Sequence, residues 1–265
     1  MSKRCVTWGT CAGLSLVPSA ALAGAWTLPA GTGQATVTAT MSSATGAFDT
    51  SGVVQPTARY NKFELQGWIE YGMTDRFTAI VAPGLQHVDI ASPIGTQRTG
   101  LGYTEFGGRY SLLQGDSWVF SGQTTMRVPG TNDTSNPAAI GYTGAETDVR
   151  ALFGTSFSVY GMAAFFDLQL AQRFRAGAPP NEFRADATFG IRPAERWMVL
   201  VQSFNVISEG AGSPPFSSYE YFKLQLSAIY ALTPAWSVQF GGYTAYAGRN
   251  ALQENGAVLG LWYRF

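Results

Sequence analysis

Apolar and polar residues alternate along almost the whole chain, and charged residues occupy nearly always the same one of the two alternating rows. In 60–71, for example, Phe63 and Leu65 alternate with Lys62 and Glu64. A period of two places successive side chains on opposite faces of a β-strand. The sequence therefore predicts a series of strands, each with one face in an apolar medium.

Twelve such strands can be marked, and two kinds of connection alternate strictly between them. The tight kind falls at residues 73–76, 114–117, 154–156, 193–196 and 232–235. The long kind is rich in Gly, Pro, Ser and Asn and falls at residues 44–57, 91–98, 129–141, 176–181, 209–217 and 247–252. This layout predicts an all-β fold, a 12-stranded antiparallel up-and-down transmembrane β-barrel with tight periplasmic turns and long outer loops.

Residues 1–23 have the pattern of a cleaved signal peptide. Lys3 and Arg4 form a basic start, an apolar stretch follows, and the triplet at 21–23 (Ala-Leu-Ala) matches a small-x-small cleavage site. We therefore expect export through a cleaved signal peptide, with residues 24–265 forming a single barrel domain.

Composition agrees with an exported membrane barrel. Removal of the signal peptide would remove both cysteines, Cys5 and Cys11, which leaves no thiol for disulfides or redox chemistry. Fifteen basic and seventeen acidic residues would remain, a balance that gives no basic surface for nucleic acid. Charged residues make up 13% of the chain, about half the usual share. No mature stretch has the roughly twenty apolar residues of a membrane helix. We therefore expect the protein to be located in the outer membrane of a Gram-negative bacterium.

Aromatic residues recur at one end of the predicted strands. The tight turns at 73–76, 114–117, 193–196 and 232–235 are followed directly by Phe77, Trp118, Trp197 and Trp236. Aromatic rings at one level are typical of the girdle between headgroups and hydrocarbon. These four residues are the predicted membrane girdle in contact with outer-membrane lipid.

The chain ends in an alternating strand, with Leu259, Leu261, Tyr263 and Phe265 in one apolar row. No strand edge can remain unpaired in hydrocarbon. The last strand is therefore expected to pair with the first, near residues 34–42, and to run to its final residue.

The whole chain resembles Gram-negative outer-membrane β-barrels. In that class a C-terminal aromatic after alternating apolar residues is the signal for the barrel assembly machinery, so the resemblance implies that Tyr263 and Phe265 act as the assembly signal. Within the class, "GLGYTEFGGRYSLLQ" (100–114) and "FSGQTTMRVPG" (120–130) are similar to segments of barrels labelled as phenol meta-cleavage-pathway transporters. This narrower resemblance implies passage of small, often aromatic or apolar, solutes.

The charged rows of such a barrel face its interior, the lumen. They hold similar numbers of acids and bases, among them the predicted lumen or constriction residues Lys62, Glu64, Glu70, Glu105, Arg109, Arg127, Glu146, Asp148, Arg150, Asp167, Arg173, Arg184, Asp186 and Lys223. Of these, Arg109, Arg127 and Arg150 are expected at similar depth on three consecutive strands. Two interpretations remain open, a structural network of ion pairs and a charged constriction that small solutes pass.

The sequence predicts neither an enzyme nor a cofactor or metal site. His87 is the only histidine, and the position two residues later, where outer-membrane lipid hydrolases carry a serine, holds Asp89. One histidine without cysteines does not make a zinc site. The polar loop at 129–137 lacks the Glu and Gly spacing of a calcium loop.

The function expected from these patterns is an outer-membrane channel or facilitator for small solutes with a narrow, charge-balanced lumen. A structural or interaction barrel with a filled lumen, in an envelope complex, is the first alternative. An outer-membrane lipid hydrolase is the second. Expected partners are outer-membrane lipid, the assembly machinery and small solutes, and the oligomeric state stays open.

Overall fold

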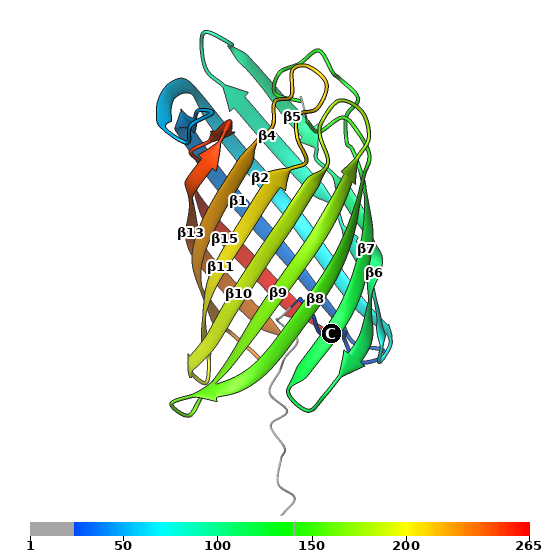
Figure 1. Ribbon diagram of the computed structural model, residues 1–265. Helices are drawn as coiled ribbons and strands as arrows, with labels where there is room; N and C mark the ends of the chain where they lie inside the picture. The colour runs from blue at the N-terminus through cyan, green and yellow to red at the C-terminus, as the bar shows by residue number, and fades with distance from the viewer. Residues whose placement is uncertain (1–23, 140) are drawn as a thin grey trace, which may run out of the picture.

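The computed structural model describes residues 24–139 and 141–265, which form one closed β-barrel (Figure 1). The predicted signal peptide, residues 1–23, lies outside the described residues. The strand segments are β1 (Gly33–Phe48), β2 (Val54–Thr74), β3 (Phe77–Ala82), β4 (Gly84–Ile90), β5 (Thr96–Leu101), β6 (Thr104–Gln114), β7 (Trp118–Val128), β8 (Glu146–Val159), β9 (Met162–Arg175), β10 (Glu182–Ala194), β11 (Trp197–Ser208), β12 (Glu220–Ala231), β13 (Trp236–Arg249), β14 (Ala251–Leu252) and β15 (Asn255–Arg264).

These segments make twelve barrel strands, because three of the strands are interrupted. Pro83 separates β3 from β4, a bulge at 102–103 separates β5 from β6, and 253–254 separate β14 from β15. Every neighbouring pair is antiparallel, and β1 pairs with both β2 and β15. The predicted 12-stranded antiparallel barrel is therefore confirmed. Among the residues described, no helix has the length and apolarity to cross a membrane.

The connections lie at the two ends of the barrel. In Figure 1 the tight turns are at the bottom and the long loops at the top. The tight-turn end carries the turns at 75–76, 115–117, 160–161, 195–196 and 232–235. The long-loop end carries the connections at 49–53, 91–95, 129–145, 176–181 and 209–219, and the single residue Asn250. The predicted alternation of tight and long connections is present except at the last one, where the single residue Asn250 replaces a long loop.

One predicted tight turn is wrong. The β8–β9 turn lies at Tyr160 and Gly161, both with positive φ (49° and 78°), and not at 154–156. Two central residues of positive φ make the tight connection that fits the twist of a hairpin. Gly154 suggested a turn, but it lies within β8 and leaves room for the Trp26 ring, with which a Cβ there would overlap.

The predicted long connections at 44–57 and 247–252 are also shorter in the structure. The reason is that β1, β2 and β13 extend beyond the residues that alternate clearly in polarity. Phe48 pairs with Val54 on one side and with Ala251 on the other. Backbone pairing with neighbours on both sides extends these strands where side-chain polarity gives no signal.

The structure also assigns the faces of 76–90 and 197–206, whose rows do not separate by polarity. Inward residues near the tight-turn end are apolar in both strands, for example Ile80 and Met198. Met198 belongs to a buried cluster with Leu200 and Ile229, against which Trp262 packs. A strand that is apolar on both faces carries no alternation, so its faces could not be read from the sequence.

Candidate functional site: the lumen

An inner segment, residues 24–32, precedes β1 and enters the barrel at the tight-turn end. Hydrogen bonds from the barrel wall hold its backbone. The N–H of Ala25 donates to Asp167 Oδ2 at 2.7 Å, and the Ser121 hydroxyl donates to the Ala25 carbonyl at 2.7 Å. Both wall residues are almost completely buried. The inner segment is therefore fixed inside the lumen by hydrogen bonds to the barrel wall.

The following residues of the inner segment run along β2 and β3. The Leu28 N–H donates to the Thr78 hydroxyl at 2.8 Å, and the Ala30 N–H donates to Asp75 Oδ1 at 3.0 Å. Gly72 allows this close approach, because a Cβ there would overlap the Leu28 carbonyl. The segment is thus fixed along one side of the lumen.

Trp26 fills the space beside this wall. It packs against a buried cluster of Ala25, Val119 and Leu152, and its ring lies on Gly154. The tight-turn end of the lumen is therefore narrowed by an aromatic ring that belongs to the chain's own N-terminal region.

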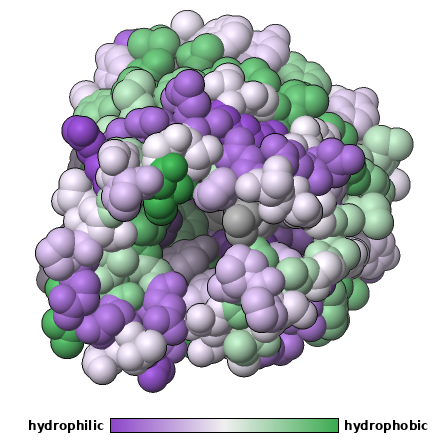
Figure 2. Space-filling view, turned by 90° about the horizontal axis from the view of Figure 1, so that it is seen from above, coloured by the Kyte–Doolittle hydropathy of each residue, from purple (hydrophilic) through white to green (hydrophobic). Residues whose placement is uncertain are grey.

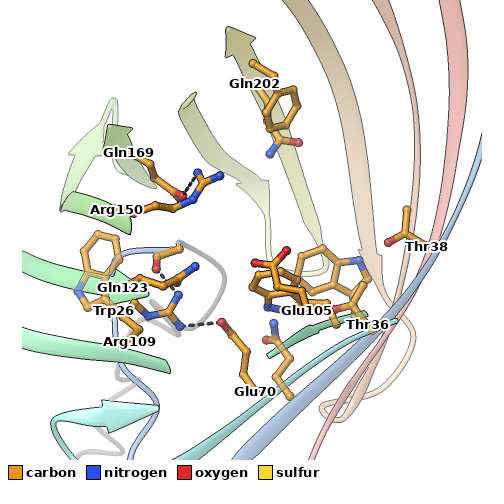
Figure 3. Close-up of a pocket in the computed structure, with 15 residues that line it drawn as sticks. Trp26, Thr36, Thr38, Glu70, Glu105, Arg109, Gln123, Arg150, Gln169 and Gln202 are labelled. Atoms are coloured by element: carbon orange, nitrogen blue, oxygen red, sulfur yellow. Dashed lines mark hydrogen bonds and ion pairs between the residues drawn. The ribbon is translucent and has the colours of Figure 1, made fainter. Parts of the chain in front are cut away.

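A cavity of about 400 Å³ lies next to the inner segment (Figure 3). Arg109, Gln123 and Arg150 lie on one side of it with Trp26, and Thr36 and Thr38 lie across from them. Its other lining residues are Gly24, Gln34, Trp68, Glu70, Glu105, Gln169, Gln202, Phe204 and Trp262. A second cavity of about 330 Å³ adjoins it and shares the side chains of Gln202, Phe204 and Trp262. This middle region of the lumen offers both aromatic and hydrogen-bonding surface.

Ion pairs join neighbouring strands along one side of the lumen, beside the cavity that Figure 3 shows, which we call the middle cavity. Arg150 contacts Asp148 (2.6 Å), Asp186 (2.8 Å) and the Gln169 side-chain oxygen (3.1 Å). Asp148 also accepts from Arg173 at 2.9 Å. These side chains come from β8, β9 and β10, and all are mostly buried. We refer to these five residues as the charged layer.

Beyond the charged layer, a further cavity of about 400 Å³ opens toward the long-loop end. It is lined by five basic side chains (Lys62, Arg127, Arg173, Arg175, Arg184) and three acidic ones (Glu64, Glu146, Glu182). It shares no lining residue with the middle cavity. From this end the barrel is hollowed at its centre, and hydrophilic residues gather around the opening (Figure 2).

Aromatic rings complete the wall of this outer cavity. The Arg127 guanidinium lies 4.2 Å from the centre of the Tyr103 ring and pairs with Glu105 at 3.3 Å and with Glu146. A cation over a ring face is attracted by the ring quadrupole. Arg175 also pairs with Glu146, at 2.8 Å. Arg173 lies 3.7 Å from the same carboxylate, so three arginines share one buried acid.

Tyr219 connects this network to the loop at 209–219. Its hydroxyl donates to Glu182 at 2.6 Å and accepts from Arg175 at 2.8 Å. Burial, together with the neighbouring Glu182 carboxylate, raises the pKa of Tyr219, so its hydroxyl stays protonated at neutral pH and keeps its donor role.

A separate pair of contacts lies on the β1–β2 and β12 side. Lys62 pairs with Glu64 at 2.9 Å. Lys223 pairs with Glu254, which also accepts from the Ser42 hydroxyl at 2.5 Å. The lumen charges thus form groups of opposite sign, as buried charges require.

The fourteen predicted lumen residues all project inward, and thirteen of them form ion pairs with one another or with Arg175, Glu182 or Glu254. Asp167 is the exception among them. The expected depth of Arg127 is wrong. Arg109 and Arg150 both pair across strands with Gln123, whereas Arg127 lies opposite Glu105, four residues along β6 from Arg109 toward the long-loop end.

Sequence reasoning missed the inner segment and the inward aromatic residues around it. Residues 24–32 show no alternation and no charged residue, so no pattern indicated that they fill the lumen. Phe204 lies on the strand whose faces could not be assigned. Trp68 and Trp262 both lie opposite an apolar row, and this location was the available signal for an aromatic lining.

The predicted girdle and assembly residues lie on the outer surface. Phe77, Trp118, Trp197 and Trp236 all begin strands at the tight-turn end, and each is partly exposed on the outer face. Tyr263 stacks on Trp236 and on Phe265, with ring centroids 4.4 and 5.7 Å apart. The aromatic band therefore continues through the last strand. Its role at the lipid interface and in assembly stays a prediction.

His87 lies outside the lumen, on the outward face of β4. Its Nδ1 atom is 2.6 Å from the Thr99 hydroxyl oxygen. The Asp89 carboxylate accepts from Asn61 at 3.5 Å and makes no hydrogen bond with His87. Among residues 24–139 and 141–265, no group of three metal-ligating side chains occurs.

No protein-family model matches this chain, and no curated protein matches it. Solved structures do. An outer membrane channel from Pseudomonas putida F1 superposes with a TM-score of 0.73 at 14% identity, over 91% of this chain and 98% of that one. The translocator domain of the autotransporter NalP from Neisseria meningitidis superposes with a TM-score of 0.52 at 11% identity, over 88% of each chain. The transport unit of the autotransporter AIDA-I from Escherichia coli superposes with a TM-score of 0.50 at 10% identity, over 89% of this chain and 91% of that one. This chain therefore has the fold of outer-membrane β-barrels.

Proposed function

We propose that this protein is an outer-membrane channel or facilitator that passes small solutes through a narrow, charge-balanced lumen. The observation that carries the proposal is the series of cavities along the barrel. The middle cavity and the outer cavity, each of about 400 Å³, both border the charged layer, since Arg150 and Gln169 line the first and Arg173 lines the second. Arginine side chains are long and flexible, so exchange of ion-pair partners can connect the two spaces.

The size of the barrel supports a small solute. A barrel of twelve strands is narrower than the sixteen- to eighteen-stranded barrels that leave an open aqueous channel. The inner segment and Trp26 narrow the lumen further at the tight-turn end. A solute that passes must therefore fit beside Trp26 and through the charged layer.

The contents of the lumen support one alternative, a structural barrel in the outer membrane. Paired buried charges and a docked inner segment are also what a permanently filled lumen contains. For a lipid hydrolase there is no comparable support, because the Asp89 carboxylate that could orient His87 is engaged by Asn61.

Conductance in planar bilayers decides between channel and structural barrel. Wild type is compared with a variant that lacks residues 25–30 and with Tyr160→Ser, a control in the β8–β9 turn outside the lumen. We expect small, discrete conductance steps for wild type and the control, and larger steps for the deletion. If wild type and the deletion variant are both folded and electrically silent, the lumen is a packed core and the channel proposal is wrong.

A further inference from the structure

Asp167, on β9, has an unusual position among the inward acids. Its side chain is 1% exposed, yet no arginine or lysine of the described residues forms an ion pair with it. Its hydrogen bonds come from the Ala25 N–H (2.7 Å) and the Gln169 amide (2.8 Å). A buried carboxylate with only neutral donors lacks the compensation that each other predicted lumen acid has.

The cations closest to this position are already engaged. Arg109 pairs with Glu70 at 2.7 Å and donates to the Gly24 carbonyl. Arg150 lies between Asp148 and Asp186. Neither guanidinium makes a hydrogen bond with Asp167 in the structure, so both are committed to other carboxylates.

Gly24 lies directly beside this carboxylate. A Cβ at Gly24 would lie 3.5 Å from Asp167 Oδ1 and would overlap the Gln169 amide. The next backbone nitrogen, that of Ala25, already donates to the same carboxylate. The Gly24 nitrogen is bonded to the same Cα as this Cβ, so it lies within about 6 Å of Asp167 Oδ1, a distance that rotation of a freed terminal amine can shorten. The fit also explains glycine here, since a side chain would displace Gln169.

We propose that signal-peptide cleavage ahead of Gly24 creates the counter-ion of Asp167. Hydrolysis breaks the bond between the Ala23 carbonyl carbon and the Gly24 nitrogen. Water supplies the hydroxyl of the Ala23 carboxyl group and one hydrogen of the new amine. The amine then takes up a proton, since the α-amino group has an ordinary pKa of about 8. The resulting ammonium pairs with Asp167.

This step couples processing to docking of the inner segment. Before cleavage the Gly24 nitrogen is a neutral amide, and Asp167 has no cationic partner. After cleavage the ion pair fixes the first residue of the inner segment inside the lumen. The inference rests on the proposed cleavage site and does not depend on whether the barrel conducts.

Amine labelling tests the pair, because only a neutral amine reacts with acetic anhydride. The mature chain has just two lysines, Lys62 and Lys223, which serve as internal references. The mass of protein purified from membranes is first measured by mass spectrometry to locate its N-terminus. The protein is then treated with limiting isotope-labelled acetic anhydride at pH 7.5. Labelling of the N-terminal peptide is compared in wild type, Asp167→Asn and the control Asp116→Asn, which changes an exposed turn residue.

We expect slow labelling of the α-amine in wild type and in Asp116→Asn, and labelling at least tenfold faster in Asp167→Asn. The asparagine oxygen can still accept from Ala25, so the change removes charge and keeps the hydrogen bond. Equal rates in folded wild type and Asp167→Asn would overturn the proposal, as would a mature chain that does not begin at Gly24. If Asp167→Asn fails to fold, wild type itself decides: an α-amine that reacts as fast folded as in urea contradicts the pair.

Discussion

Arg150 shows how single residues connect the strands of this barrel from within. It contacts acceptors on its own strand and on the next two strands, at Asp148, Gln169 and Asp186. The stability of such a group depends on its completeness, since each charge is desolvated and compensated only by its neighbours. Single substitutions in the charged layer should therefore affect both stability and permeation.

Replacing Arg150 with serine should destabilise the barrel and widen the lumen. Asp186 loses its ion pair and Asp148 keeps only Arg173, so we expect a loss of about 3 kcal/mol in the free energy of unfolding. Conductance should rise and shift toward cations, because uncompensated acids remain. Urea unfolding in lipid vesicles and reversal potentials in a KCl gradient measure the two effects.

Arg249→Ser is the matched control for this change. Arg249 pairs with Glu220 at the long-loop rim at 2.7 Å, but its side chain is 57% exposed. An exposed ion pair is screened by water and contributes little to stability. Equal losses of stability in the Arg150 and Arg249 variants would contradict the difference between the buried layer and the rim.

Asp49 provides a pH-dependent contact in the connection at 49–53. The Gln55 side chain donates to Oδ2 (3.1 Å), and the N–H groups of Ser51 and Val53 donate to Oδ1 (2.8 and 3.0 Å). The Gln55 hydrogen bond, followed by these backbone donors, holds the pKa of Asp49 below its ordinary value of 3.8. The ionised carboxylate therefore stabilises the folded connection at pH values above 3.8. This stabilisation is lost as the pH falls through the lowered pKa of Asp49.

Carboxyl NMR titration should accordingly place the midpoint of Asp49 below 3.8. Gln55→Ala should move the midpoint back toward 3.8, since the first cause of the shift is removed. Gln97→Ala, at another exposed glutamine of the long-loop end, should leave it unchanged. An identical midpoint in wild type and Gln55→Ala would contradict this account.

The last strand closes the barrel, and its final residue takes part in the closure. Phe265 donates its N–H to the Gly33 carbonyl (3.0 Å) and accepts from the Gly33 N–H (2.7 Å). Its ring lies over Gly33, where a Cβ would overlap it, and stacks on Tyr263. Both hydrogen bonds and ring packing therefore end at the chain terminus.

Deletion of Phe265 should leave an exported, protease-sensitive product that does not fold. The edge of β1 near Gly33 would lose its partner, and an unpaired backbone edge is unfavourable in hydrocarbon. Heat-modifiable gel mobility measures folding, and Phe265→Tyr, which keeps ring and backbone, is the control. Folding of the deletion variant at the wild-type level would show that the terminal residue is not required for closure.

At the scale of the whole molecule, the lumen changes character along the barrel axis. Apolar clusters around Leu152 and Met198 fill it near the tight-turn end, whereas ion pairs and the outer cavity occupy the long-loop half. The outer surface is apolar along the strands, with exposed side chains such as Val37, Leu226 and Leu259. An exposed apolar surface of this extent is typical of a side that faces a membrane.

Thiol labelling on intact cells should place the long-loop end outside. Single cysteines at Asp133 and Ser213 should react with an impermeant maleimide, and cysteines at Asp75 and Tyr160 should react only after the outer membrane is permeabilised. A cysteine at Leu152, which is buried, should stay unlabelled in the folded barrel. The opposite pattern would invert the assignment of the two ends.

The sequence alone determined the strand number, the end of the barrel at which each connection lies and the inward direction of the predicted lumen charges. These features are local, because a strand in a membrane barrel has only two faces and lipid excludes charge from one of them. The exposed Phe63 row and the inward Lys62 row needed no knowledge of the partners of β2.

Only the tertiary structure decided what those charges contact and what else enters the lumen. The stagger between strands sets which inward residues meet, and no local pattern encodes it, so Arg127 was placed beside Arg109 although it lies nearer the long-loop end. The inner segment has no period at all, and its position depends on distant partners such as Asp167 and Gly154. Gly154, which suggests a turn in the sequence, lies within β8 in the folded barrel, where its missing side chain leaves space for the Trp26 ring.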